Sequence, residues 1–238
     1  MRETLTIIIP LFNEEENIQR LDNELSKFLK ISIVDSQVLF INDGSTDNSE
    51  DILRKICESK KKFKLISFKK NHGLSTAIKA GFDYAETTLI GYIDADLQTN
   101  PEDFNLLLKK IDKNDLVTGY RKIRKDSIIK SASSFIANKI RRLFTRDEII
   151  DTGCPLKIIR TSFAKKIPMF KGLHRFLPAM ILLQNGKVSQ VPIKHYPRKA
   201  GKAKYGFFNR LIEPLIDCIA YLWIKNKYID YQIKDNQV

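Results

Sequence analysis

The 238-residue sequence has few cysteines and no long apolar run. Cys57, Cys154 and Cys218 are far apart and form no C-x-x-C pair, which argues against a disulfide framework and against a thiolate zinc site. No apolar stretch reaches the roughly 18 residues of a membrane-spanning helix. The N-terminal residues MRETLTIIIP are too short and too strand-like for a signal peptide. We therefore expect a cytoplasmic protein, or one attached to a membrane from the cytoplasmic side.

Negative charge is scarce in the second half of the chain. Residues 120–238 hold 25 Lys and Arg against 8 Asp and Glu, whereas residues 1–119 hold 16 against 20. This asymmetry favours a polyanionic partner, either nucleic acid or an anionic membrane, although a solvated lysine-rich surface would give the same counts. No recognised nucleic-acid-binding motif is present, so a basic nucleic-acid-binding protein is the weaker hypothesis.

Short apolar runs alternate with helical patterns through the first half of the chain. We expect buried strands at 5–12, 36–43, 63–68, 89–94 and 115–120. Helices are expected at 15–29, 45–58, 73–85 and 100–111, with Ser45 or Thr46 and Asn100 as N-terminal caps. This alternation predicts an α/β fold, with a mostly parallel sheet and helices on both faces. We expect one domain over residues 1–210 and a basic amphipathic extension over 211–238.

Polar residues follow all five expected strands. They are Asn13-Glu14, Asn42 to Ser45, Asn71 to Gly73, the group Asp94, Asp96 and Gln98, and Arg121. In open α/β sheets ligands bind beyond the carboxyl ends of the strands, so these residues are expected to share one site. Any one of them alone could be turn chemistry.

Asp94, Asp96 and Gln98 supply only oxygen ligands. Such a set suits Mg²⁺ or Mn²⁺, and no histidine or cysteine stands beside them to favour zinc. Mg²⁺ is usually held by one or two carboxylates together with substrate phosphates, so the pattern predicts a phosphate-bearing substrate. The alternative is that the aspartates only cap the helix that follows, but Asn100 already offers that cap. The common glycine-rich phosphate loops, G-x-x-x-x-G-K-[ST] and G-x-G-x-x-G, are absent.

The stretches IIIPLFNEEENI, INDGSTDNS, NHGLSTAIKAGFDYA and YIDADLQTNPED resemble family 2 glycosyltransferases of the GT-A fold. With DTGCPLKIIR, HRFLPAMI and VPIKHYPRKAGKAKYG, they are similar to the group of dolichyl-phosphate mannose synthase and the bacterial polyprenyl-phosphate glycosyltransferases. The resemblance covers about residues 4–210. It implies an inverting transferase that moves a sugar from a UDP- or GDP-linked donor to a polyprenyl phosphate. A soluble saccharide or protein acceptor is the alternative.

The resemblance also implies roles for single residues. The nucleotide sugar would be bound by Pro10, Asn13, Glu14, Asp43, Gly73 and Asp94. The divalent metal, Mg²⁺ or Mn²⁺, would be held by Asp94, Asp96 and Gln98. Catalysis would depend on Asp96, on Arg121 near a donor or acceptor phosphate, and on Asp151, which matches a proposed catalytic aspartate of some relatives. The acceptor phosphate would be bound by Arg198, Lys202 and Lys204.

Two segments of the second half combine basic and apolar residues. Residues 121–146 have helical spacing that fits either a helix on an anionic membrane surface or an ordinary surface helix. Residues 207–229 are more apolar, with Tyr221, Trp223 and Tyr228 as candidate interface anchors, but acidic residues and a proline interrupt the run. We therefore expect a peripheral protein on the cytoplasmic face of the membrane, with a homo-oligomer contact as the alternative use of 207–229.

Overall fold

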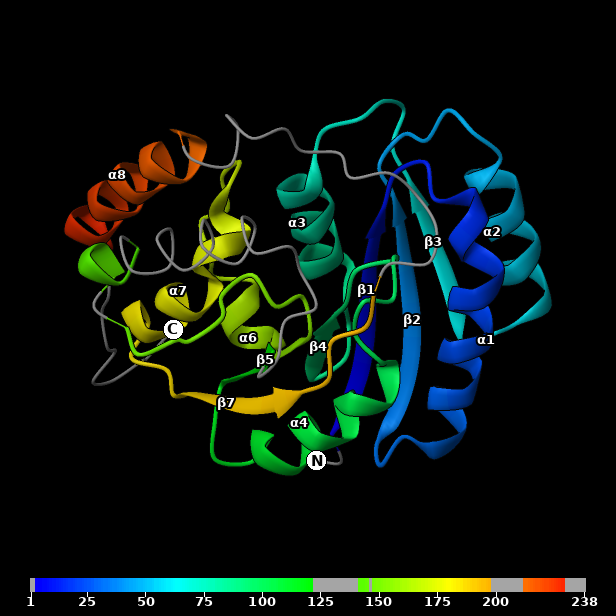
Figure 1. The fold of residues 1–238 in the computed structure, drawn as a ribbon, viewed down its shortest axis with the longest axis horizontal. Helices are drawn as coiled ribbons and strands as arrows, with labels where there is room; N and C mark the ends of the chain where they lie inside the picture. Colours follow the sequence, from blue (N-terminus) through cyan, green and yellow to red (C-terminus); the bar gives the residue numbers. More distant parts are fainter. Residues whose placement is uncertain (1–2, 122–140, 146, 198–211, 230–238) are drawn as a thin grey trace, which may run out of the picture.

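The structure is a computed structural model, and it describes residues 3–121, 141–145, 147–197 and 212–229. Its centre is a seven-stranded sheet in the order β3-β2-β1-β4-β6-β5-β7 (Figure 1). The strands are β1 Thr4–Leu11, β2 Asp35–Asn42, β3 Phe63–Ser67, β4 Leu89–Tyr92, β5 Leu116–Arg121, β6 Lys157–Arg160 and β7 Val188–Ile193. The helices are α1 Glu15–Ile31, α2 Ser49–Ser59, α3 Leu74–Tyr84, α4 Phe104–Ile111, α6 Thr161–Ala164, α7 Leu177–Leu183 and α8 Ile212–Lys227, with short 3₁₀ helices η1 Pro101–Asp103 and η2 Leu173–Phe176.

The sheet is mostly parallel, as predicted. Strand β1 pairs in parallel with β2 and β4, β2 with β3, and β5 with β7. The exception is β6, which runs antiparallel to both β4 and β5. All five expected strands are present, whereas β6 and β7 were not among the expectations.

Helices cover both faces of the sheet, which confirms the predicted α/β architecture. One core layer joins side chains of α1, α2 and α4 to inward-facing residues of β1 such as Ile7 and Ile9. The other joins α3, η2, α7 and part of α8 to Ile8 on the opposite face of β1. Because successive strand residues point to opposite faces, the run Ile7-Ile8-Ile9 contributes to both layers.

One expected helix cap is wrong. Helix α2 begins at Ser49, with Asn48 in the N-cap position, and not at Ser45 or Thr46. The backbone N–H of Thr46 donates to Asn13 Oδ1 at 2.8 Å, and that of Ser45 donates to Asn42 Oδ1 at 3.1 Å. Side chains outside the helix therefore hold these residues as a loop. The cap expected at Asn100 is confirmed, because its side chain accepts from the backbone N–H of Glu102.

Helix α8 packs against η2. The rings of Phe176 and Tyr221 stack with centroids 5.5 Å apart, and Arg175 Nη1 donates to Asp217 Oδ2 at 2.8 Å. Tyr221 is only 3% exposed, so its predicted role as an interface anchor is wrong. None of the helices in the described ranges is both long and apolar enough to cross a membrane. Of the basic segment 121–146, residues 122–140 and 146 lie outside the described residues.

The pairing register brings the loops after the first four strands to one edge of the sheet. Leu11 of β1 lies opposite Asn42 of β2, and Asn42 lies opposite Ser67 of β3. On the other side of β1, Ile8 lies opposite Tyr92 at the end of β4. The polar residues expected after these four strands therefore lie at this edge.

Candidate active site

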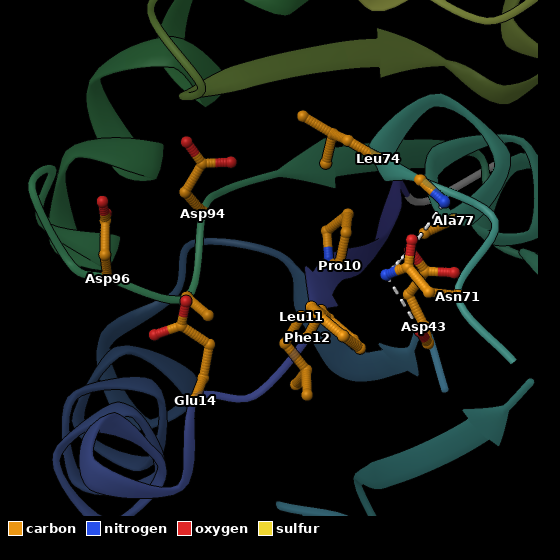
Figure 2. Close-up of a pocket in the computed structure, with 12 residues that line it drawn as sticks. Pro10, Leu11, Phe12, Glu14, Asp43, Asn71, Leu74, Ala77, Asp94 and Asp96 are labelled. Carbon is orange, nitrogen blue, oxygen red and sulfur yellow. Dashed lines mark hydrogen bonds between the residues drawn. The ribbon is translucent and has the colours of Figure 1, made fainter. Parts of the chain in front are cut away.

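A cleft of about 360 Å³ opens at this edge of the sheet (Figure 2). Six of the predicted site residues line it, namely Pro10, Glu14, Asp43, Gly73, Asp94 and Asp96. Four of these six carry carboxylates. An anionic ligand such as a diphosphate is repelled by so much negative charge unless a cation accompanies it.

Asp94 and Asp96 lie on the loop that follows β4, with their carboxylates on the same side of it (Figure 2). The Tyr92 hydroxyl donates to Asp94 Oδ1 at 2.6 Å, and the backbone N–H of Gln98 donates to Asp96 Oδ1 at 3.1 Å. Burial and the negative charge of Asp96 raise the pKa of Asp94 to about 6. A cation between the two carboxylates would relieve that repulsion.

The residue set at this loop fits Mg²⁺ or Mn²⁺. The described residues contain no cluster of three or more His, Cys, Asp or Glu suited to a metal, so a site here would have two carboxylates. A hard divalent cation held by two carboxylates completes its shell with phosphate oxygens, an amide oxygen and water. Gln98 belongs to the same loop but does not line the cleft, and its backbone carbonyl accepts from the N–H of Tyr196 at 2.9 Å.

The Asp43 carboxylate fixes the loop between β3 and α3. It accepts from Asn71 Nδ2 at 3.0 Å, from the backbone N–H of His72 at 2.7 Å and from that of Gly73 at 2.8 Å. Gly44 is needed beside it, because its φ is +68° and an added Cβ would lie 2.3 Å from the backbone carbon of Lys70. Asp43 therefore shapes the wall of the cleft as well as lining it.

Asn13 does not line the cleft, although it was expected to bind the nucleotide sugar. Its Oδ1 accepts from the backbone N–H of Thr46, and its Nδ2 donates to Thr46 Oγ1 at 3.1 Å. Its own N–H donates to Ser45 Oγ at 2.9 Å. Asn13 adopts a positive φ of 51°, a conformation that asparagine tolerates better than most residues. It ties the loop after β1 to the loop after β2.

Arg121 and Asp151 form a nearly buried, two-point ion pair. Arg121 Nε donates to Asp151 Oδ2 at 2.7 Å and Nη2 donates to Oδ1 at 2.9 Å, while the backbone N–H of Arg121 reaches Oδ2 at 3.2 Å. The side chains are 11% and 6% exposed. The guanidinium also acts on Asp94, where its charge partly offsets the rise in the carboxyl pKa caused by burial and Asp96. The structure thus brings two of the predicted catalytic residues together, with Asp151 holding Arg121.

Sequence reasoning missed Tyr92 and Lys157. Lys157 is the residue of β6 opposite Tyr92, is 1% exposed, and donates from Nζ to the carbonyls of Thr152 and Cys154. Its Nζ lies 5.8 Å from the centre of the Tyr92 ring. Lys157 therefore supports both the loop that carries Asp151 and the tyrosine that contacts Asp94. A lysine inside the apolar run PLKIIR was the available signal.

Ser75 and His174 form a second, partly buried pair, and Ser75 lies two residues along the chain from Gly73 of the cleft. The backbone N–H of Gly172 donates to Ser75 Oγ at 3.0 Å, so the Ser75 hydroxyl proton is available for His174 Nδ1 at 2.8 Å. A neutral imidazole with its proton on Nε2 accepts this hydrogen bond, whereas the tautomer with its proton on Nδ1 donates to Ser75 Oγ. Burial and the nearby Arg175 lower the pKa of His174 to about 3.

The predicted acceptor-phosphate residues, Arg198, Lys202 and Lys204, lie outside the described residues.

Residues 6–167 match the family model described as glycosyl transferase family 2. The chain belongs to this family. The match includes every cleft residue named above, together with Arg121 and Asp151. The resemblance inferred from the strand-end motifs is therefore confirmed.

Two curated relatives of this family 2 chain are named for transfer to polyprenyl phosphates. Dodecaprenyl-phosphate galacturonate synthase of Rhizobium johnstonii is 28% identical over 225 residues, which are 92% of this chain and 66% of that protein. Undecaprenyl-phosphate 4-deoxy-4-formamido-L-arabinose transferase of Salmonella choleraesuis is 29% identical over 220 residues, 92% of this chain and 67% of that protein. The chain thus spans about two thirds of the length of these relatives.

Among solved structures, the fold is similar to glucosyl-3-phosphoglycerate synthase of Mycobacterium tuberculosis in complex with Mn²⁺, UDP-glucose and phosphoglyceric acid. The TM-score is 0.71 at 15% identity, and the match covers 96% of this chain and 81% of that one. At this identity the likeness extends to the fold alone, and it confirms the GT-A-like architecture.

Proposed function

We propose that this family 2 chain transfers a sugar from a nucleotide diphosphate donor to a polyprenyl phosphate, with Mg²⁺ or Mn²⁺ as cofactor. The observation that carries the proposal is the acidic cleft, in which Asp94 and Asp96 lie side by side opposite the loop fixed by Asp43. The names of the two curated relatives support the lipid phosphate acceptor.

The donor would lie along the carboxyl edge of β1, β2 and β4. The wall built by Asp43, Asn71 and Gly73 would face the nucleoside, and Asp94 and Asp96, with Gln98 in the same loop, would hold the metal. A divalent cation at these carboxylates supplies charge neutralisation for a diphosphate leaving group. Tyr92 and Lys157 would keep Asp94 in place through the contacts described above.

The acceptor side needs cations more than a strong base. A phosphate monoester has a second pKa near 6, so it is already largely dianionic at neutral pH and can attack the anomeric carbon without losing a proton. Among the described residues, Arg121, which is held by Asp151, is our candidate for a cation that contacts the acceptor phosphate. Arg198, Lys202 and Lys204 remain predicted partners of that phosphate. A single displacement would invert the anomeric centre. The enzyme would work as a peripheral protein on the cytoplasmic face of the membrane.

The test is incubation of the purified chain with radiolabelled UDP- or GDP-sugars, MnCl₂ or MgCl₂, and undecaprenyl phosphate in detergent. We expect a label that extracts into organic solvent, that is lost with a chelator, and that is lost in the Asp96→Ala variant. A parallel reaction with small phosphorylated acids and free sugars as acceptors covers the soluble-acceptor alternative. Product in that reaction alone, or an Asp96→Ala variant as active as the parent, contradicts the proposal.

A further inference from the structure

The outward side of α8 carries an apolar stripe. Ile216, Ile219 and Trp223 are 60%, 65% and 66% exposed. At about 100° per residue these three positions fall within roughly 60° of the helix circumference. Asp217 and Tyr221 point the other way and are buried. We refer to Ile216, Ile219 and Trp223 as the α8 apolar face.

Contacts on the buried side fix the direction of this face. Tyr221 stacks on Phe176, and Asp217 pairs with Arg175. The backbone of Gly172 also approaches the Asp217 side chain closely, since a Cβ on Gly172 would lie 2.3 Å from Asp217 Oδ2. Rotating α8 to hide its apolar face would break the Asp217–Arg175 pair. The exposure of the stripe is therefore set by the way the helix is held.

More exposed apolar side chains lie close to this face. Ile229, just past the end of α8, is 82% exposed, and Leu143 in the helical segment 141–145 is 74% exposed. That segment lies beside α8 (Figure 1), where the charge of Arg141 acts on the pKa values of Cys218 and Tyr221. Elsewhere in the described residues, Ile31, Ile33 and Leu106 form a second exposed apolar group, whose side chains are 42–53% exposed against 60–82% in the group at α8. An apolar concentration of this kind marks a binding surface.

Exposed cations flank the α8 apolar face. Lys227 follows Trp223 by one helical turn, and Arg142 adjoins Leu143. Among the described acidic side chains of this region, Asp217 and Asp147 are paired with Arg175 and Arg141, and Glu148 is exposed. Aliphatic residues, a tryptophan and flanking Lys and Arg are the composition of helices that lie in the interface of an anionic bilayer.

We propose that the α8 apolar face docks on an anionic lipid bilayer, with Ile216, Ile219 and Trp223 at the boundary between headgroups and acyl chains. The flanking cations contact lipid phosphates. This assignment rests on the proposed function in that a polyprenyl phosphate acceptor would lie in the same bilayer. A second copy of the chain is a poorer occupant, because a symmetric contact would bring the cations around both faces together.

Trp223 makes the proposal directly measurable, because it is the only tryptophan in the sequence. We expect its fluorescence maximum to move to shorter wavelength when vesicles of phosphatidylcholine with about a third phosphatidylglycerol are added, and the protein to sediment with them. Vesicles of pure phosphatidylcholine should give a clearly smaller effect, and raising the salt concentration should weaken binding to the anionic vesicles.

A pair of variants distinguishes binding through the α8 apolar face from nonspecific binding through other exposed apolar side chains. Ile216→Ser/Ile219→Ser should lower the vesicle partition coefficient about tenfold or more, since both side chains lose most of their transfer free energy. Ile33→Ser/Leu106→Ser is the matched control, because it removes two exposed apolar side chains from the region of α1 and α4 and should bind as the parent does.

Two results would overturn the proposal. One is a parent protein that stays in the supernatant with an unchanged Trp223 spectrum. The other is a blue shift without vesicles that grows with protein concentration, which would assign this face to a second copy. Transfer of sugar in detergent is measured separately on the same variants. Vesicle binding without a lipid-linked product would contradict the proposed function alone. A lipid-linked product without vesicle binding would contradict the docking proposal alone.

Discussion

Arg121 at the end of β5 and Asp151 in the loop before β6 form a two-point ion pair, in which Nε and Nη2 of Arg121 donate to the two carboxylate oxygens of Asp151. Both side chains are largely withdrawn from solvent. A carboxylate that accepts three hydrogen bonds from one arginine is well placed to position that arginine. We infer that Asp151 acts on the reaction through Arg121, not as a general base.

Replacing Asp151 tests this relationship. Asp151→Asn should lower kcat and lower the free energy of unfolding by about 3 kcal/mol, because it leaves a buried guanidinium without its counter-charge. If Asp151 acts only through Arg121, the double variant Arg121→Lys/Asp151→Asn should be little worse than the poorer single variant. Additive losses in the double-mutant cycle, or an acidic limb of the kcat/KM profile that disappears in Asp151→Asn, would instead assign Asp151 an independent role.

Tyr92 is expected to tune the metal site. Tyr92→Phe removes only the hydroxyl that donates to Asp94 Oδ1, so the carboxylate loses its orientation while the ring still packs beneath Lys157. Affinity for Mn²⁺, measured by titration calorimetry in the presence of nucleoside diphosphate, should fall roughly tenfold. Tyr84→Phe is the control, since Tyr84 is 69% exposed on α3. Equal Mn²⁺ affinities in the two variants would rule out this role for Tyr92.

Asp43 is expected to hold the loop between β3 and α3. Asp43→Ala leaves the N–H groups of His72 and Gly73 without their acceptor and should lower the free energy of unfolding by about 2–3 kcal/mol. Amide hydrogen exchange is the sharper measurement, because it should accelerate at these two residues and stay unchanged in α4. Protected amides at His72 and Gly73 in the variant would show that the loop is held in another way.

His174 should make the fold sensitive to mild acid. Its pKa is about 3 in the folded chain and about 6.5 when unfolded, so the unfolded chain binds the extra proton. The contribution of His174 to the free energy of unfolding is therefore fully present above pH 6.5 and is lost as the pH falls toward 3. At pH 5 the loss is about 2 kcal/mol. His174→Asn keeps an acceptor for Ser75 and should flatten the parent's decline in urea-unfolding free energy between pH 7.5 and 5. An NMR titration of His174 with a midpoint near 6.5 would contradict this.

The first five strands could be predicted because each is a short, strongly apolar run. The parallel connections also predicted that the residues after the first four strands meet at one edge of the sheet, where the cleft lies. Strand β6 was not predicted from the sequence pattern. It has only four residues, and Lys157 within it is charged, although the fold buries that charge against two backbone carbonyls and the Tyr92 ring.

What the sequence could not predict depends on contacts between distant segments. Tyr221 and Trp223 were equivalent aromatic residues in one apolar run, and only the packing of α8 on Phe176 separates the buried residue from the exposed one. Asn13 and Asp43 were assigned to the ligand from their position after strands. The structure shows that their polar atoms also bind neighbouring loops, and no local pattern encodes those partners.

The central claim is that a nucleoside diphosphate group binds in the acidic cleft only together with a divalent cation at Asp94 and Asp96. Titration calorimetry of UDP and GDP into the parent chain, with MnCl₂ and with a chelator, tests it most directly, and Asp94→Asn/Asp96→Asn provides the isosteric control. We predict binding of at least one nucleotide with Mn²⁺, none with the chelator, and at least a tenfold loss of affinity in the variant. Metal-independent binding, or equal affinity in the parent and the variant, would contradict the account.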